Sequence, residues 1–312
     1  MTKLKDCLIG FITGDAMGVP IEFYPREKLI KNPVKKMYGF GSHYVPAGSW
    51  SDDTSMTIAT IDSIVQNNGW NYKDIFEKWY KWAVDYEYTP CNLRFDIGNT
   101  CLEAIINYSK KGKDPLECGL NDIKSNGNGS LMRMIPVVFY SYYKKLKVKD
   151  IIKLTNEVSS LTHAHDISKL GCYIYVRYMM YLLEGFDKYE AYNKIRKLSY
   201  SFYSKKSIDV YNRILKNDIS KLEIDDISSS GYIVSTLEAS LWVILNTKNF
   251  NQAIIGSINL GNDTDTIGAI TGSIAGLIYG YDNIDKKWEN KLLRLDYLLN
   301  LITEFDNYLL MK

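Results

Sequence analysis

The sequence is poor in the residues that build zinc sites and disulfide frameworks. It contains 3 histidines and 5 cysteines, and no two cysteines form a Cys-x-x-Cys pair. Zinc favours Cys and His ligands, so this composition argues against a zinc site. An odd number of unpaired cysteines argues against a disulfide framework, and we expect reduced thiols in the cytoplasm.

The chain also lacks an excess of either charge and any long apolar run. The 38 basic and 36 acidic residues leave a net charge of +2, with both signs interspersed, so no nucleic-acid partner is expected. The apolar run near the N-terminus is short and is interrupted by Asp15, which argues against a signal peptide or a membrane anchor. We expect a protein without a membrane partner, and a monomer.

Proline and strand patterns are scarce. There are 7 prolines, of which Pro136 is the last, and no segment shows the sustained alternation of a strand. Apolar spacing predicts helices near both ends, at 4–17 and 292–302, and after Pro136 at 151–161, 167–183, 208–215, 232–245 and 253–260. An apolar content of 46% is typical of a globular core. The sequence therefore predicts an all-α fold, as one compact multi-helix domain over residues 1–312.

Two acidic clusters stand out against this background. Asp52 and Asp53 open one apolar stretch, and Asp263 and Asp265 open another. Ser51 is a good helix cap, so each cluster is expected at a helix N-terminus. The simplest alternative is that acidic residues merely favour helix N-termini through the helix dipole. Both clusters, however, carry neighbouring hydroxyl residues.

If the two clusters meet, their charges need compensation. Four carboxylates brought together repel one another and lose protons reluctantly. One or two divalent cations would remove that cost, and hard oxygen ligands suit Mg²⁺ or Mn²⁺.

Regularly spaced glycines suggest how the clusters meet. Gly10, Gly14 and Gly18 fall four apart, as do Gly268, Gly272, Gly276 and Gly280. Glycine costs a helix about 1 kcal/mol relative to alanine, so such ridges predict close approach of two helices. This packing would bring Asp15 and Glu22 towards both acidic clusters.

Three other segments allow a functional and a structural interpretation. Gly127 and Gly129 permit positive φ and an anion-binding nest, or form a flexible linker. Asp96 precedes a helix that Asn99 or Thr100 would cap, and on local grounds it is only a turn residue. His163 is interpreted locally as a residue of a capping turn.

Six motifs, in order, resemble the ADP-ribosylglycohydrolase family over residues 4–280. They are Gly14-Asp-Ala-Met-Gly-Val-Pro-Ile-Glu22, Trp50-Ser-Asp-Asp-Thr54, Phe95-Asp-Ile-Gly-Asn-Thr100, Gly127-Asn-Gly-Ser-Leu-Met-Arg133, Thr162-His163 and Gly261-Asn-Asp-Thr-Asp-Thr266. The first and third are most similar to the arginine-directed branch. The resemblance implies a single all-α domain around a binuclear Mg²⁺ or Mn²⁺ centre.

The resemblance also implies roles for individual residues. The ligands of two Mg²⁺ or Mn²⁺ ions would be Ser51, Asp52, Asp53, Asp263, Asp265 and Thr266. The catalytic residues would be Glu22, Asp53, Asp96 and Asp265, with Glu22 and Asp96 as candidates for proton transfer. The substrate would contact Gly98, Gly127, Asn128, Gly129, Ser130, Met132 and His163. The family usually has threonine at the position of Ser51 and often glycine at that of Asn262.

The implied activity is hydrolysis of the bond between ADP-ribose and a protein side chain, most simply arginine. Serine-linked or free ADP-ribose conjugates are alternative substrates. A catalytically silent ADP-ribose-binding relative is a further alternative, although no acidic ligand has been lost. A metal-dependent phosphatase would place its aspartate pair after an early strand, and no such strand is predicted.

Overall fold

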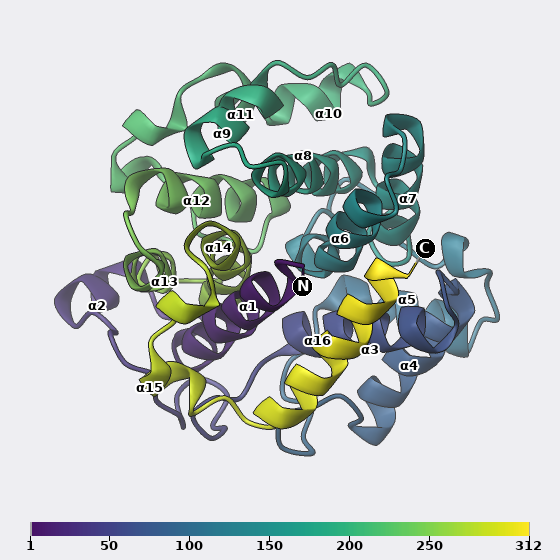
Figure 1. The fold of residues 1–312 in the computed structure, drawn as a ribbon, viewed down its shortest axis with the longest axis horizontal. Helices are drawn as coiled ribbons and strands as arrows, with labels where there is room; N and C mark the ends of the chain where they lie inside the picture. Colours follow the sequence, from purple (N-terminus) through teal and green to yellow (C-terminus); the bar gives the residue numbers. More distant parts are fainter. Residues whose placement is uncertain (1, 312) are drawn as a thin grey trace.

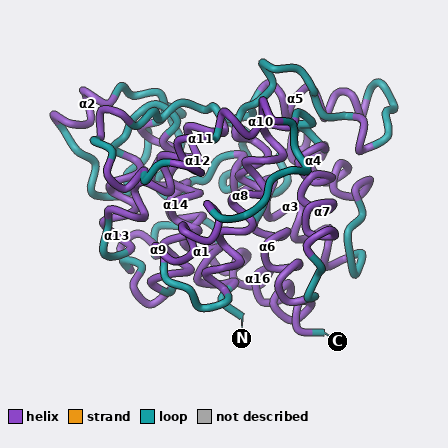
Figure 2. Tube along the Cα trace, turned by 90° about the horizontal axis from the view of Figure 1, so that it is seen from above, coloured by secondary structure: helices purple, strands orange, loops and turns teal. Residues whose placement is uncertain are grey.

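The computed structural model describes residues 2–311, and within this range it contains no β-strand (Figures 1 and 2). Two isolated bridges, Leu120 to His163 and Gly127 to Tyr232, are the extended pairings present among these residues. The described helices pack around one hydrophobic core that extends from Leu4 to Leu309. The prediction of a compact all-α domain is confirmed.

The helices have the following bounds. The first eight are α1 Leu4–Gly18, α2 Arg26–Lys31, α3 Asp52–Gln66, α4 Tyr72–Asp85, α5 Asn99–Ser109, α6 Ile135–Tyr143, α7 Val148–Ser160 and α8 Asp166–Leu183. The others are α9 Lys188–Arg196, α10 Lys205–Val210, α11 Asn212–Lys216, α12 Ile233–Asn246, α13 Phe250–Ile258, α14 Thr264–Tyr279, α15 Lys286–Glu289 and α16 Leu295–Leu310. Short 3-10 helices include Val19–Ile21 and Asn128–Arg133.

Helices α1 and α14 lie side by side at the centre of the molecule (Figure 1). A Cβ atom built on Gly14 would lie 1.9 Å from the carbonyl oxygen of Gly268, and one on Gly10 would lie 2.3 Å from that of Gly272. On the other helix, a Cβ on Gly276 would lie 2.0 Å from the oxygen of Asp6. The two backbones therefore touch, and the predicted contact of the glycine ridges is confirmed for Gly268, Gly272 and Gly276. Gly280 lies beyond the end of α14, and a Cβ built on it would meet no atom within 4 Å, so it is not part of the ridge.

Some helix predictions were wrong in detail. The segment predicted as one helix at 208–215 is two, α10 and α11, separated by Tyr211, whose buried hydroxyl donates a 2.7 Å hydrogen bond to the carbonyl of Ile167. Helix α9 was missed because its sequence is largely polar. Its start nevertheless carries a signal, since Asp187 and Glu190 form a capping box.

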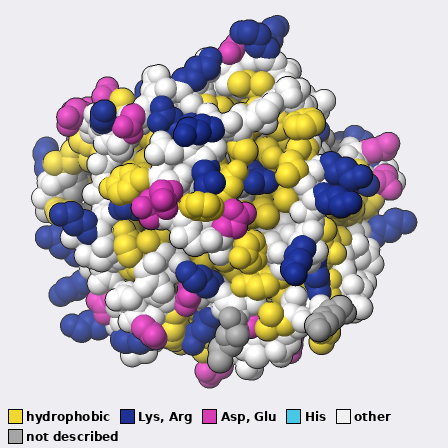
Figure 3. Space-filling view, turned by 45° about the horizontal axis from the view of Figure 1, so that its top comes forward, with side chains coloured by type: hydrophobic (Ala, Val, Ile, Leu, Met, Phe, Trp, Pro, Cys, Tyr) yellow, Lys and Arg dark blue, Asp and Glu magenta, His cyan; other side chains and the backbone are white. Residues whose placement is uncertain are grey.

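The surface agrees with the balanced composition. On the face drawn in Figure 3, basic and acidic side chains are interspersed with apolar ones and are not segregated by sign. Among residues 2–311, no helix is long and apolar enough to cross a membrane.

Candidate active site

The first acidic cluster begins α3 and is clamped by α1. Ser51 caps the helix, its hydroxyl accepting a 3.3 Å hydrogen bond from the Asp53 amide. Asp15, fully buried on α1, accepts hydrogen bonds from the Ser51 amide at 3.0 Å and the Thr54 hydroxyl at 2.6 Å. Asp15 thus satisfies donors that a helix N-terminus leaves free, and it fixes α3 against α1.

The second cluster begins α14 and meets the first directly. The Thr266 hydroxyl donates to Oδ2 of Asp53 at 3.3 Å, which joins the two clusters. Asp263 occupies the cap position of α14 but makes no side-chain capping bond. Its Oδ2 instead accepts a 2.9 Å hydrogen bond from Nδ2 of Asn128. A capping hydrogen bond therefore does not explain Asp263.

Three carboxylate oxygens of this region have no hydrogen-bond partner among residues 2–311. Oδ1 atoms of Asp53, Asp263 and Asp265 are buried and accept no hydrogen bond. Buried polar atoms are rarely left unsatisfied, so three such atoms in one region leave room for a water, a ligand or an ion. A set of carboxylate and hydroxyl oxygens fits a hard divalent cation such as Mg²⁺ or Mn²⁺.

The electrostatics point the same way. Burial raises the pKa of Asp52, Asp53 and Asp265 well above the ordinary range, and repulsion between neighbouring carboxylates raises it further. The pKa of Asp263 is also raised by burial, although its hydrogen bonds oppose the shift. Without a cation, the surroundings therefore favour the protonated forms of these aspartates. A bound cation would favour their ionised forms.

A cavity of about 380 Å³ lies over the two clusters. Most residues predicted for the site line it, namely Glu22, Asp52, Asp96, Gly98, Gly127, Asn128, Gly129, Met132, His163, Asp263, Asp265 and Thr266. Ser51, Asp53 and Ser130 are buried and are not part of its lining. Ser51 and Asp53 remain in the cluster through their mutual 3.0 Å hydrogen bond.

The glycine loop has a different geometry from the one predicted. Gly127 has φ −66° and is followed by the 3-10 helix, and neither Gly127 nor Gly129 adopts positive φ. Position 129 requires glycine because a larger residue would clash: a Cβ there would lie 2.8 Å from the Cys101 sulfur and 2.9 Å from Cε1 of His163. The loop is thus no positive-φ nest.

The hydroxyl of Ser130, the last residue of that glycine loop, faces the core and not the cavity. It lies 3.3 Å from the Cys172 sulfur and is fully buried. A direct side-chain contact of Ser130 with substrate is therefore not supported, whereas its place in the loop keeps the neighbouring residues in position. The binding roles of the cavity-lining loop residues remain predictions.

His163 faces the cavity, and the neighbouring histidine does the capping. Nδ1 of His163 lies 2.7 Å from the Thr162 hydroxyl, and burial lowers its pKa to about 3, so its imidazole is neutral. His165, not His163, caps α8 by accepting from the Ile167 amide. The interpretation of His163 as a capping residue was wrong.

Asp96 lines the cavity from the loop before α5. The cap residue of that helix is Gly98, without a side-chain capping bond, so the predicted cap by Asn99 or Thr100 was wrong. The Gly98 amide instead donates to Oδ2 of Asp52 at 3.3 Å. This bond ties the Asp96 loop to the first acidic cluster.

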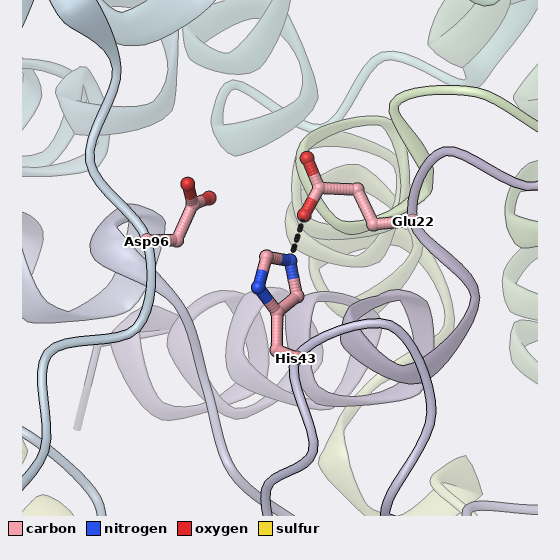
Figure 4. Close-up of side chains that lie close together, drawn as sticks. All are labelled: Glu22, His43 and Asp96. Atoms are coloured by element: carbon pink, nitrogen blue, oxygen red, sulfur yellow. Dashed lines mark hydrogen bonds and ion pairs between the residues drawn. The ribbon is translucent and has the colours of Figure 1, made fainter.

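His43 was also missed from the sequence; it does not line the cavity but contacts Glu22, which does. Six further lining residues were not predicted as site residues, namely Phe23, Ile97, Asn99, Thr100, Cys101 and Gly231. Nε2 of His43 contacts Oε2 of Glu22, as Figure 4 shows. Ligand-type atoms of Glu22, His43 and Asp96 all lie within 4.8 Å of one another. The available signal was weak: His43 is one of three histidines and lies in the segment between α2 and α3, where no periodic pattern marks it.

The Glu22–His43 contact is best described as a hydrogen bond between neutral groups. Burial, with repulsion from Asp96, raises the pKa of Glu22 to about 10. Burial lowers the pKa of His43. An ion pair would need the opposite shifts. Because these two atoms contact each other, the unpartnered aspartate oxygens are better suited than this trio to hold a cation.

The fold is helical, and a carboxylate-rich cavity lies over two helix N-termini. These two features define the class: an α-helical protein with an acidic, enzyme-like site. The chain belongs to the ADP-ribosylglycohydrolase family, whose model matches residues 1–311.

Named relatives cover most of the chain. It is 32% identical over 304 residues to an ADP-ribosylarginine hydrolase Tri1 of Serratia proteamaculans, covering 96% of this chain and 78% of the relative. It is 26% identical to the ADP-ribosyl-[dinitrogen reductase] glycohydrolase of Rhodospirillum rubrum, covering 91% of this chain and 88% of that one. A solved ADP-ribosylglycohydrolase-related protein complex shares the fold, with a TM-score of 0.83 at 24% identity over 99% and 98% of the two chains.

Proposed function

We propose that this protein hydrolyses the glycosidic bond between ADP-ribose and an arginine side chain of a protein, reversing mono-ADP-ribosylation. The observation that carries the proposal is the meeting of two aspartate pairs, with three unpartnered buried oxygens, at the floor of the cavity. The names of the two relatives, an ADP-ribosylarginine hydrolase and an ADP-ribosyl-[dinitrogen reductase] glycohydrolase, support this substrate class.

The proposed cofactor is a pair of Mg²⁺ or Mn²⁺ ions held by Ser51, Asp52, Asp53, Asp263, Asp265 and Thr266. When bound, such ions supply Lewis acidity and lower the pKa of a bound water. The unpartnered oxygens of Asp53, Asp263 and Asp265 fit this role. The family match and the acidic cluster support metal dependence, and the number and identity of the ions are part of the proposal.

Glu22 and Asp96 line the same cavity as these ligands and can serve the scissile bond. Burial raises the pKa of Glu22, which favours its protonated form, so it can donate a proton to the leaving nitrogen. Asp96 supplies a carboxylate for the delocalised positive charge of the guanidinium. A serine linkage carries no such charge, and an acidic cavity therefore favours arginine.

The test is ADP-ribose release from matched arginine-linked and serine-linked peptides, with Mg²⁺, with Mn²⁺ and with a chelator. We expect faster release from the arginine-linked peptide and loss of release with the chelator. Equal or faster turnover of the serine-linked peptide would overturn the arginine assignment. Retained turnover in chelator would overturn the metal assignment. A cytoplasmic location and a monomeric state remain predictions.

A further inference from the structure

The chain around His43 is docked tightly against Glu22. A Cβ on Gly41 would lie 1.8 Å from the carbonyl oxygen of Pro20, so the backbones are in contact. The Ser42 amide donates to the same Pro20 oxygen at 3.0 Å, and the Ser42 hydroxyl donates to the Glu22 carbonyl at 2.5 Å. Three successive residues, Gly41, Ser42 and His43, therefore hold the backbone and side chain of the Glu22 segment.

The imidazole of His43 is itself held between two aromatic rings. Its ring centroid lies 5.0 Å from that of Phe95 and 5.9 Å from that of Phe23. Its side chain is 11% exposed. Phe23 directly follows Glu22 and Phe95 directly precedes Asp96, so the ring contacts both segments that carry these cavity-lining acids.

The His43 imidazole is the one protein partner that the carboxyl group of Glu22 has among residues 2–311. This contact occupies Oε2 and leaves Oε1 without a protein partner. Without it, Glu22 would have no group to hold it where Asp96 and Asp263 oppose its charge. A carboxyl group in that position would be free to turn out towards water.

We propose that His43 is a positioning residue, which holds Glu22 at the cavity so that its free oxygen faces the scissile bond. The proposal rests on the proposed function, because Glu22 must act on the ADP-ribosyl bond for its position to matter. His43 itself does not touch the substrate in this scheme. It acts through Glu22, by one hydrogen bond.

Two substitutions separate the hydrogen bond from the packing. His43→Phe keeps an aromatic ring between Phe23 and Phe95 but removes the nitrogen. His43→Gln loses the ring but places an amide nitrogen near the position of Nε2. We expect His43→Phe to lower kcat by about tenfold to a hundredfold with little change in KM, because small misplacements of catalytic groups cost up to about a hundredfold. We expect His43→Gln to retain most of the wild-type kcat.

If His43→Phe stays active and His43→Gln is impaired, the proposal is overturned, because this result is expected when His43 acts only by packing. Equal wild-type activity of both variants would overturn it too. The melting temperatures of both variants should be measured alongside, so that a loss of fold is not mistaken for a loss of turnover.

A second measurement needs no substrate. The ¹⁵N shifts of the His43 ring should change on Glu22→Ala and change much less on Asp96→Ala, which removes a neighbour that makes no hydrogen bond to the ring. Unchanged ¹⁵N shifts in Glu22→Ala would show that the contact is not made in solution, and would overturn the proposal. Wild-type protein that releases no ADP-ribose from arginine would instead remove the proposed function, while the shifts would still report the contact.

Discussion

The floor and the rim of the cavity are built by different means. The floor, defined as Ser51–Thr54 with Asp263–Thr266, consists of two helix N-termini clamped by α1. The rim, defined as Glu22, His43 and Asp96, lies on connecting segments. The rim segments also contain bulky residues at positive φ, with Phe23 at 66°, Phe40 at 60° and Tyr44 at 55°. The floor residues themselves show no positive φ, although Asn262, directly before Asp263, has a φ of 61°.

The difference matters because backbone strain costs folding free energy, whereas the packing of two helices holds residues in place without that cost. A non-glycine residue in the left-handed region costs on the order of 1–3 kcal/mol and persists where the surroundings enforce it, often at functional sites. The floor needs rigid placement of several carboxylates, which contact between the backbones of α1 and α14 provides. The rim must present a few side chains to a substrate that enters and leaves, and loops held by specific hydrogen bonds provide that.

The largest expected effect comes from separating the helices that support the floor. Gly14→Ala places a methyl group 1.9 Å from the Gly268 oxygen, so the helices must move apart. We expect a loss of about 1–3 kcal/mol or more in the free energy of unfolding, measured by denaturant titration. Gly256→Ala is the matched control, because its Cβ would meet a side-chain carbon at 3.4 Å. Similar stability of the two variants would contradict the role of the glycine contact.

A second substitution removes one carboxylate of the floor and keeps the packing of the side chain. Asp265→Asn preserves shape but replaces a proposed metal ligand, so we expect at least about a hundredfold lower activity, beyond the loss typical of residues around a metal site. Calorimetric titration with Mn²⁺ should show weaker binding. Because the variant relieves charge repulsion, the metal-free protein should melt no lower than wild type. A lower melting temperature with unchanged Mn²⁺ affinity would contradict a ligand role.

At the rim we expect a smaller and purely kinetic effect. Asp96→Asn removes a carboxylate that is also a candidate for proton transfer, and kcat for arginine-linked substrate should fall by about a hundredfold, the lower end of a proton-transfer contribution. KM and Mn²⁺ affinity should change little, since Asp96 is outside the proposed ligand set. An increase in KM with unchanged kcat would make Asp96 a binding residue instead.

The smallest expected effect is that of Ser51→Thr, which, compared with Ser51→Ala, separates the role of the Ser51 hydroxyl from that of the side chain's size. Ser51→Ala removes a helix cap, which typically costs about 1 kcal/mol of stability, together with a proposed metal ligand. Ser51→Thr keeps the hydroxyl and restores the residue usual in the family, so activity should stay close to wild type. Thermal melts and turnover should be compared for the two. If Ser51→Thr is as inactive as Ser51→Ala, the buried floor does not tolerate the added methyl group.

Much of the floor could be predicted from local pattern. Ser51 before two aspartates and an apolar stretch marks a helix start, and glycines four apart mark one smooth helix face. These signals are local, because capping and helical periodicity depend on neighbours within one or two turns. The polar helix α9 escaped detection since its surface face shows little apolar periodicity, although Asp187 and Glu190 marked its start.

The sequence by itself therefore determined the helical class, the two acidic helix starts and the glycine faces that bring them together. The tertiary structure decided which oxygens of Asp53, Asp263 and Asp265 lack partners, and why Gly129 must be glycine. It also decided that His43 meets Glu22. Such contacts join residues far apart in the chain through irregular segments, where no periodicity relates one position to another, so only the folded packing specifies them.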